Sequence, residues 1–216
     1  MQDIFFEFGQ VQKKLVVGTV NTTNGVYTTY DETEPFASIP TTVLASASIP
    51  GAFPPTYYDY GIYMDGGTVW NTNLAYGVHK CREFVESDEQ IVVDVAICNS
   101  LEELNQTTSL ENTIDHYLRY REIKKYYSTL NDVLEFKQTV PLAQYRYLFT
   151  PSEELPGGAK LLLFNRETLE PMIELGKADV ERVLSQGEGN GFDMLEAWSN
   201  DAHLRNQRFS RYLYSH

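Results

Sequence analysis

The chain has 216 residues, 42% of them hydrophobic and 22% charged, so it can bury one sizeable core and is too apolar for wholesale disorder. Its 30 Asp and Glu outnumber 17 Lys and Arg and give a net charge of −13, which repels phosphate backbones and argues against a nucleic-acid partner. No apolar run approaches the ~20 residues of a membrane-spanning helix, so no transmembrane segment is expected.

The first predicted elements form a hairpin. Residues 15–20 and 26–30 are rich in β-branched and aromatic side chains, and the intervening residues 21–25 include an Asn-Gly turn. A short helix is expected over residues 41–48. The prolines that follow it forbid regular structure until about Tyr58.

A βαβ unit is expected next. It consists of a strand over residues 61–64, a helix over residues 73–84 and a strand over residues 91–98. The last strand is almost continuously apolar, which predicts burial on both faces, as in a parallel sheet. Its Cys98, and Cys81 in the preceding helix, are expected to be small buried hydrophobic residues without a disulfide framework or a zinc site.

The second half of the chain is predicted to alternate helices and extended segments, without internal repeats or a long linker. The expected elements are a helix over 110–137, extended chain over 138–150, a strand over 161–164, a helix over 168–185, a glycine-rich stop over 187–191 and a helix over 192–214. The resulting fold class is α/β.

The most informative stretch lies in the first half. Residues 45–55 read Ala-Ser-Ala-Ser-Ile-Pro-Gly-Ala-Phe-Pro-Pro, and Asp65-Gly66-Gly67 follows directly after the strand at 61–64. Open α/β sheets build their sites at the carboxyl ends of strands. The two glycines let the chain turn away and leave the carboxylate uncovered.

This stretch resembles the C-terminal part of the patatin-like phospholipase domain. That family shows an Ala-Ser-x-Ala-x-Pro-x-x-Phe-x-Pro run, then Asp-Gly-Gly or Asp-Gly-Ala and an Asn, often ahead of a Pro. Here Ser48 stands where the family usually has Ala, the Asn is Asn71, and Asn73 takes the Pro position. The resemblance extends over residues 15–98, and residues 168–184 are similar to a late family helix.

The resemblance implies a three-layer α/β/α fold with a mainly parallel sheet that is incomplete at its N-terminal side. The patatin-like part would span residues 1–185, followed by a helical tail over residues 186–216. The implied activity is serine-type hydrolysis of phospholipid, lysophospholipid or acylglycerol esters, with no cofactor and no metal. Asp65 is implied as the general base that accepts the serine proton, and Gly66 and Gly67 complete its motif.

The nucleophile half of the implied Ser–Asp dyad is missing. No Gly-x-Ser-x-Gly and no glycine-rich oxyanion segment occur in the sequence; the nearest approach, around Ser185, follows a helix rather than a strand. We therefore expect either the C-terminal part of a longer acyl hydrolase or a catalytically inactive relative that binds lipid or a partner. That partner could be a complementary N-terminal half or a second copy, because the incomplete sheet would expose edges.

A third hypothesis is that the chain is an unrelated acidic α/β domain that mediates an interaction. For both patatin-like hypotheses, the acyl hydrolase and the inactive relative, the expected substrate or ligand is an acyl ester at a membrane surface. The expected location is the cytoplasm or the periphery of a membrane.

Several other residues are of types that occur in catalytic, phosphate-binding or metal sites. Asp65 by itself also fits a simple turn cap. Ser46 and Ser48 are expected to be packing positions, and the glycines of residues 187–191 do not follow a strand as a phosphate loop would. No two of the four histidines have the spacing of a helical metal site; they are His79, His116, His203 and His216.

Aromatic side chains cluster in the sequence next to Asp65. They suit either a lip that contacts lipid, since tyrosine has an apolar body and a polar tip, or ordinary packing. The cluster comprises Phe53, Tyr57, Tyr58, Tyr60 and Tyr63.

Overall fold

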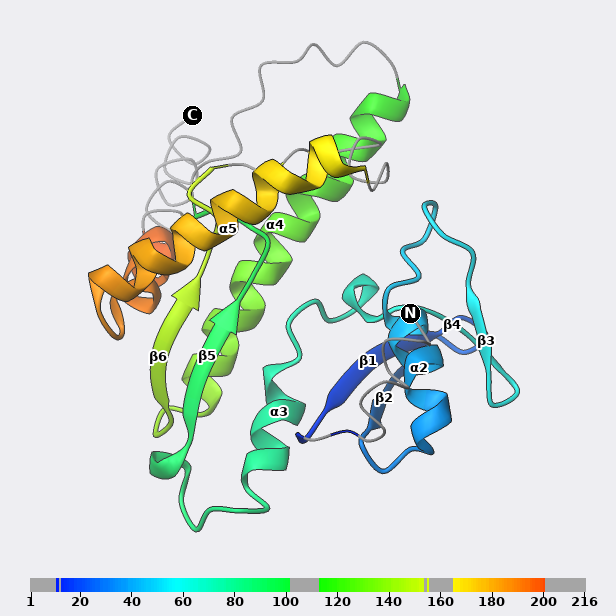
Figure 1. Cartoon of the computed structure of the whole chain (residues 1–216), viewed down its shortest axis with the longest axis horizontal. Coiled ribbons are helices and arrows are strands. Elements are labelled where there is room, and N and C mark those ends of the chain that lie inside the picture. The colour runs from blue at the N-terminus through cyan, green and yellow to red at the C-terminus, as the bar shows by residue number, and fades with distance from the viewer. Residues whose placement is uncertain (1–10, 12, 102–112, 154, 156–164, 201–216) are drawn as a thin grey trace, which may run out of the picture. The chain divides into compact units, whose positions relative to one another are not determined.

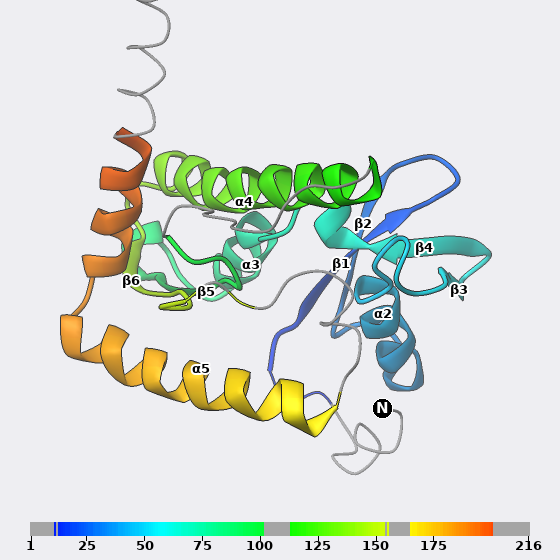
Figure 2. The ribbon, with the colours of Figure 1, turned by 90° about the horizontal axis from the view of Figure 1, so that it is seen from above.

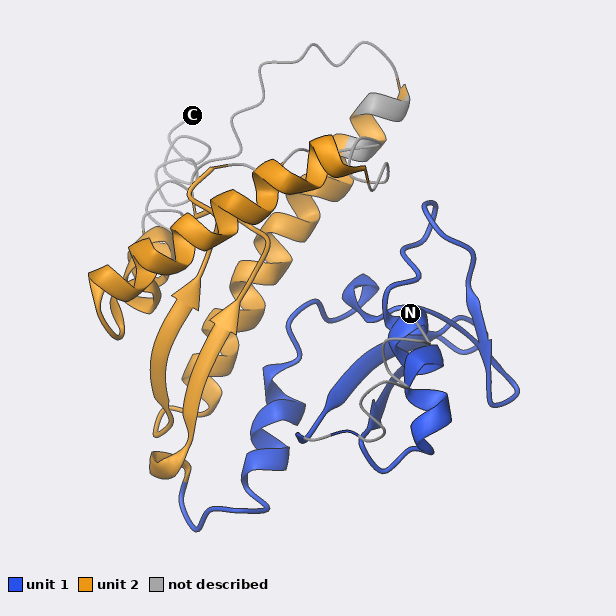
Figure 3. Cartoon of the chain, viewed as in Figure 1, with its two compact units in different colours: residues 1–87 blue, residues 88–216 orange. Residues whose placement is uncertain are grey.

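The structure is a computed structural model that describes residues 11, 13–101, 113–153, 155 and 165–200 (Figure 1). The chain divides into two compact units, residues 1–87 and residues 88–216 (Figure 3). Each unit has its own sheet. None of the helices in the described ranges is both long and apolar enough to cross a membrane.

The first unit contains a four-stranded sheet in the order β2-β1-β4-β3. The strands are β1 (Val16–Asn21), β2 (Tyr27–Asp31), β3 (Thr56–Tyr58) and β4 (Gly61–Asp65), and all neighbours pair antiparallel. The predicted hairpin is confirmed as β1 and β2. Its turn closes through Gly25 N–H, which donates to the Asn21 carbonyl at 2.9 Å, and Gly25 has a φ of 72° that favours glycine.

The core of this unit lies between the sheet and α2 (Ile39–Ser46). Pro40 stands in the first turn of α2, where its missing N–H costs no hydrogen bond. On the sheet side, Tyr30 packs edge-on against both Tyr58 and Tyr63, with ring centroids 5.3 and 5.8 Å apart. Ala45 of α2 is fully buried in the same cluster, which leaves room for the rings.

Shorter helices complete the first unit and begin the second. A 3-10 turn, η1 (Phe36–Ser38), leads into α2, and a second, η2 (Gly66–Thr68), follows β4. The predicted helix after Asn73 is confirmed as α3 (Leu74–Cys81). A third turn, η3 (Asp88–Gln90), opens the second unit.

The second unit is built on two parallel strands, β5 (Val92–Ala96) and β6 (Gln144–Phe149). The long helix α4 (Thr113–Thr139) connects them, and α5 (Arg166–Gln186) follows. Figure 2 shows α4 along one face of the pair and α5 along the other. This arrangement confirms the predicted α/β class and gives the unit its three layers.

The larger sheet differs from the expectation of a mainly parallel one, because the four strands of the first unit are antiparallel. Turns of a few residues join β1 to β2 and β3 to β4, and such short connections permit only antiparallel pairing. The expected βαβ unit through residues 73–84 does not form, since β4 and β5 belong to separate sheets; the parallel pair is closed by α4 instead.

The prediction that residues 91–98 are buried on both faces is wrong. Ile91, Val93, Val95 and Ile97 are buried, whereas the alternate positions are exposed; these are Val92, Asp94, Ala96 and Cys98. A continuous apolar run does not reveal which positions a helix will cover, and here the alternate side chains of β5 are left exposed. Cys81 is exposed as well, so the expected burial of both cysteines is also wrong.

The end of the chain is described only in part. Helix α5 confirms the predicted helix over 168–185, and Gly187, with a φ of 88°, ends it. Residues 190–200 are helical, as expected for the start of the tail. The expected strand at 161–164 and the rest of the tail lie outside the described residues, and the division at residue 185 stays a prediction.

Candidate functional site

Asp65 is the last residue of β4 and the N-cap of the 3-10 turn η2. Its backbone N–H donates to the Ser48 carbonyl at 3.0 Å, and it lies opposite Thr19 in the pairing of β4 with β1. Its carboxylate accepts a hydrogen bond from the Gly67 N–H, with 2.7 Å between Oδ1 and the nitrogen. The half-buried carboxylate is therefore held at the carboxyl end of a strand, as the sequence motif predicted.

The two glycines of the motif are required by space rather than by backbone angle, since neither has a positive φ. A Cβ on the buried Gly66 would overlap the Gly18 carbonyl of β1. A Cβ on Gly67 would stand 2.7 Å from Asn71 Oδ1 and 3.0 Å from Asp65 Oδ1. The side chain of Asn71 thus lies over the turn beside the carboxylate, and a larger residue at position 67 would have to displace it.

The departure from the family motif at Asn73 has a local structural role. Its side chain accepts a hydrogen bond from the Tyr76 N–H at 3.3 Å and so caps α3. The same side chain donates to the Tyr27 hydroxyl at 3.2 Å, and the Tyr27 ring packs edge-on against Trp70 at 5.9 Å. Position 73 therefore links the segment after the motif to β2.

Neither serine near the motif is arranged as a nucleophile. Ser48 is 3% exposed; its hydroxyl donates to the Leu44 carbonyl at 2.9 Å and is hydrogen-bonded to Thr56 Oγ1 at 2.9 Å. Ser46 is the half-buried last residue of α2, not part of a strand-to-helix elbow. These positions agree with the packing roles expected from the sequence.

Two of the four histidines lie within the described residues. His79 lies exposed on α3 and His116 lies exposed on α4, whereas His203 and His216 are outside the described residues. Within the described ranges, no three His, Cys, Asp or Glu side chains are grouped so that they could hold a metal ion.

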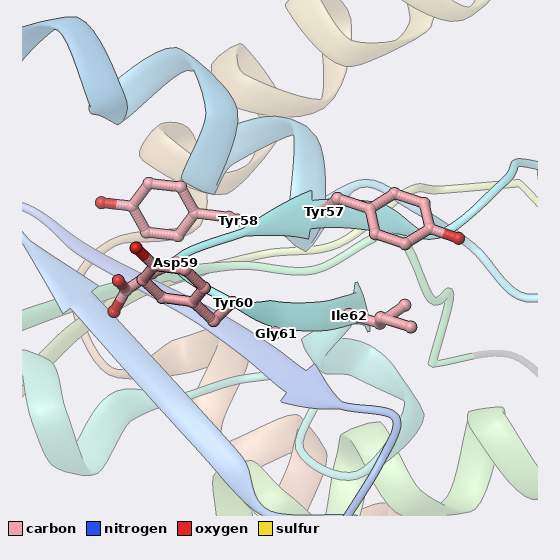
Figure 4. A pocket seen from close by; sticks show the side chains of 6 residues that line it. All are labelled: Tyr57, Tyr58, Asp59, Tyr60, Gly61 and Ile62. Carbon is pink, nitrogen blue, oxygen red and sulfur yellow. The ribbon is translucent and has the colours of Figure 1, made fainter.

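The aromatic residues before Asp65 divide into two groups. Tyr58 and Tyr63 belong to the core, whereas Tyr57 is 74% exposed and Tyr60 is fully exposed. Residues 57–62 line a shallow hollow of about 460 Å³ at the tip of the β3–β4 hairpin (Figure 4). Asp59 and Tyr60 have positive φ values of 42° and 57°, so the turn holds two non-glycine residues in a strained conformation.

A charged cluster beside the sheet was not predicted from the sequence. Lys80 of α3 pairs with Asp31 at 2.7 Å and with Glu32 at 3.3 Å, and Lys14 pairs with Glu32 at 2.7 Å. The hydrogen bond from Lys80 lowers the pKa of Asp31 to about 2, and the one from Lys14 lowers the pKa of Glu32 to about 2. Glu32 and Lys80 are 48 positions apart, too far for any local pattern to pair them.

Residues 5–78 match the family model described as Patatin-like phospholipase. The resemblance is thereby confirmed over this stretch, which contains all four strands of the first unit and the Asp-Gly-Gly turn. The matched family is one of lipid acyl hydrolases. No curated protein matches the chain. Residues 91–98 and 168–184 lie beyond the match, so their resemblance to family elements stays a prediction.

Proposed function

We propose that Asp65 is the general base of a patatin-like serine acyl hydrolase. Its position supports the assignment, because the carboxylate stands at the end of β4 within the matched residues, held by the Gly67 N–H at 2.7 Å. That hydrogen bond uses Oδ1 of the carboxylate, so we assign Oδ2 as the atom that accepts the serine proton. A half-buried carboxylate with one oxygen oriented by the backbone is suited to accept a proton from a nearby hydroxyl.

The proposed reaction is acyl transfer through a covalent intermediate. As the serine oxygen attacks the ester carbonyl, its proton passes to Asp65 and then to the departing alcohol. Water next attacks the acyl-enzyme and gives a proton to Asp65, which returns it to the serine oxygen as the fatty acid leaves. The substrate class is an acyl ester of a phospholipid, lysophospholipid or acylglycerol.

The nucleophile must come from outside the 216 residues, because these contain no Gly-x-Ser-x-Gly. It would be supplied either by further residues of the same polypeptide or by a second chain. In the alternative function, the patatin-like unit binds lipid or a partner without hydrolysis. The missing elbow favours that alternative, whereas the intact Asp-Gly-Gly turn favours the enzyme.

The test is a fusion in which the chain follows the serine-bearing N-terminal part of a patatin-like hydrolase. With a short-chain p-nitrophenyl ester, we expect turnover in the fusion and a loss on the order of 10⁴-fold in Asp65→Asn. Asn keeps the shape and one acceptor oxygen but removes the basicity. Labelling of the serine by a fluorophosphonate should slow in parallel, while substrate binding should change little.

Asp94→Asn is the matched control. Asp94 is an exposed carboxylate on β5 that pairs with Arg146, so its loss should affect turnover by no more than about threefold, as for an exposed ion pair. If Asp65→Asn remains folded and keeps turnover within about tenfold, Asp65 is only a turn residue. If the fusion folds and binds lipid but never hydrolyses it, the binding function is the better description.

A further inference from the structure

The first half of α4 presents tyrosines and basic side chains to solvent. Tyr117 is 59% exposed, Tyr120 is 57% exposed and Tyr127 is 48% exposed. Lys124 and Lys125 are exposed between them, and so is Arg121. Together these six residues are called the tyrosine–lysine face.

Helical spacing brings these residues together. Positions 117, 120, 121 and 124 follow the i, i+3, i+4, i+7 pattern of one helix face, and Lys125 lies at its edge. The opposite side of α4 is buried in the core of the second unit; it contributes Tyr126, Leu130, Val133 and Leu134. Tyr127 packs against Trp198 with ring centroids 5.8 Å apart, so its aromatic contacts extend to the helical residues 190–200.

The face is confined to one end of the helix and differs in charge from the rest of the chain. Four of the 17 Lys and Arg fall within residues 119–125, together with a single acid, Glu122. Farther along α4 the outward positions become polar or acidic, with exposed Asn131, Glu135 and Gln138. A local positive field on a chain of net charge −13 is complementary to an anionic surface.

We propose that the tyrosine–lysine face docks the protein onto the surface of an anionic lipid bilayer. Tyrosine suits the interface between water and lipid, since its ring enters the apolar side while its hydroxyl stays hydrated. Lysine and arginine near such a surface are attracted by the anionic headgroups. The proposal rests on the proposed function, because a lipid acyl hydrolase must reach esters held in a bilayer.

Co-flotation with vesicles tests the proposal on the chain itself. We expect binding to phosphatidylcholine vesicles that contain about one third phosphatidylserine, little binding to phosphatidylcholine alone, and loss of binding at high salt. Lys124→Gln/Lys125→Gln should weaken binding roughly fivefold for each lysine. Tyr117→Ala/Tyr120→Ala should weaken it as well, without melting the helix, because alanine favours helix.

The matched control removes two exposed cations elsewhere. Arg166→Gln/Lys177→Gln on α5 makes the same change in net charge at side chains that are 86% and 67% exposed. In a Trp70→Phe background, Trp198 is the one remaining tryptophan, and its emission should shift to the blue on vesicle binding.

The proposal is overturned if the control pair loses as much binding as the lysine pair, or if anionic and neutral vesicles bind equally. It is also overturned if the tyrosine variants abolish a dimer in light scattering but leave vesicle binding intact, since the face would then serve a second copy. Asp65→Asn should bind vesicles normally. The hydrolase proposal is therefore tested separately, and it fails if ester turnover does not depend on Asp65.

Discussion

Gly66 packs against the backbone of Gly18, so closely that any side chain at position 66 would overlap the Gly18 carbonyl oxygen. This contact fastens the turn after β4 to the neighbouring strand β1. It also determines where the chain leaves the sheet, and therefore where the Asp65 carboxylate stands. A side chain at the second glycine would instead meet the side chain of Asn71, which is not backbone.

The first prediction concerns Gly66→Ala. The added methyl group meets backbone rather than a movable side chain, so we expect a loss of about 1–3 kcal/mol in the free energy of unfolding. Gly77→Ala in α3 is the control, since nothing lies within 4 Å of its added Cβ and alanine favours helix. Urea denaturation of both variants measures the difference. Equal stability of the two would show that the contact with Gly18 is not tight.

The second prediction concerns the serines before the motif. Ser48→Ala removes two hydrogen bonds and leaves the buried Thr56 hydroxyl with one partner fewer, at a cost of about 1–2 kcal/mol. Ser46→Ala should stay within about 0.5 kcal/mol. A fluorophosphonate probe should label neither serine in the unfused chain, as checked by mass spectrometry. Stoichiometric labelling of Ser46 or Ser48 would contradict the need for an outside nucleophile.

The third prediction concerns the cluster around Lys80. The pKa values of Asp31 and Glu32 are depressed to about 2, so their stabilising contribution is complete above their ordinary values of 3.8 and 4.5. It is lost as the pH falls from about 5 to about 2. Lys80→Gln should therefore lower the urea midpoint at pH 7, and this difference should shrink toward zero by pH 2.

Lys177→Gln is the control for that experiment. Lys177 pairs with Glu174 on the surface of α5, with both side chains about 70% exposed. Its replacement should leave the midpoint nearly unchanged at every pH. A Lys80→Gln difference that persists undiminished at pH 2 would mean that Lys80 stabilises through packing rather than through charge.

The fourth prediction concerns the β3–β4 turn. Tyr60 is fully exposed with a positive φ, so Tyr60→Gly should relieve backbone strain of about 1 kcal/mol without loss of packing. Tyr60→Ala separates the two effects, because it removes the ring but keeps the strained conformation. Only the glycine variant should raise the urea midpoint. An equal rise in both would assign the effect to the ring.

Local patterns were sufficient for much of the fold. The β1–β2 hairpin follows from β-branched runs around an Asn-Gly turn, and α3 follows from apolar spacing behind the Asn73 cap. The proposed site residue was accessible from sequence for a similar reason. Asp65 and its two glycines form one short turn directly after a strand, so their spacing along the chain already reflects their spacing in the structure.

Only the tertiary structure decided which faces and which partners these elements use. Val92, Asp94 and Ala96 of β5 are exposed although α4 and α5 lie on the two sides of the β5–β6 pair, and an apolar run does not say which of its positions a helix will cover. Lys80 meets Asp31, and Gly66 meets Gly18, across 48 or 49 positions of chain, where no periodicity carries information. The sequence by itself determined the strand, the turn and the carboxylate at its end, because those depend on neighbouring residues. Burial and pairing were decided by the fold, because they depend on residues that only chain folding brings together.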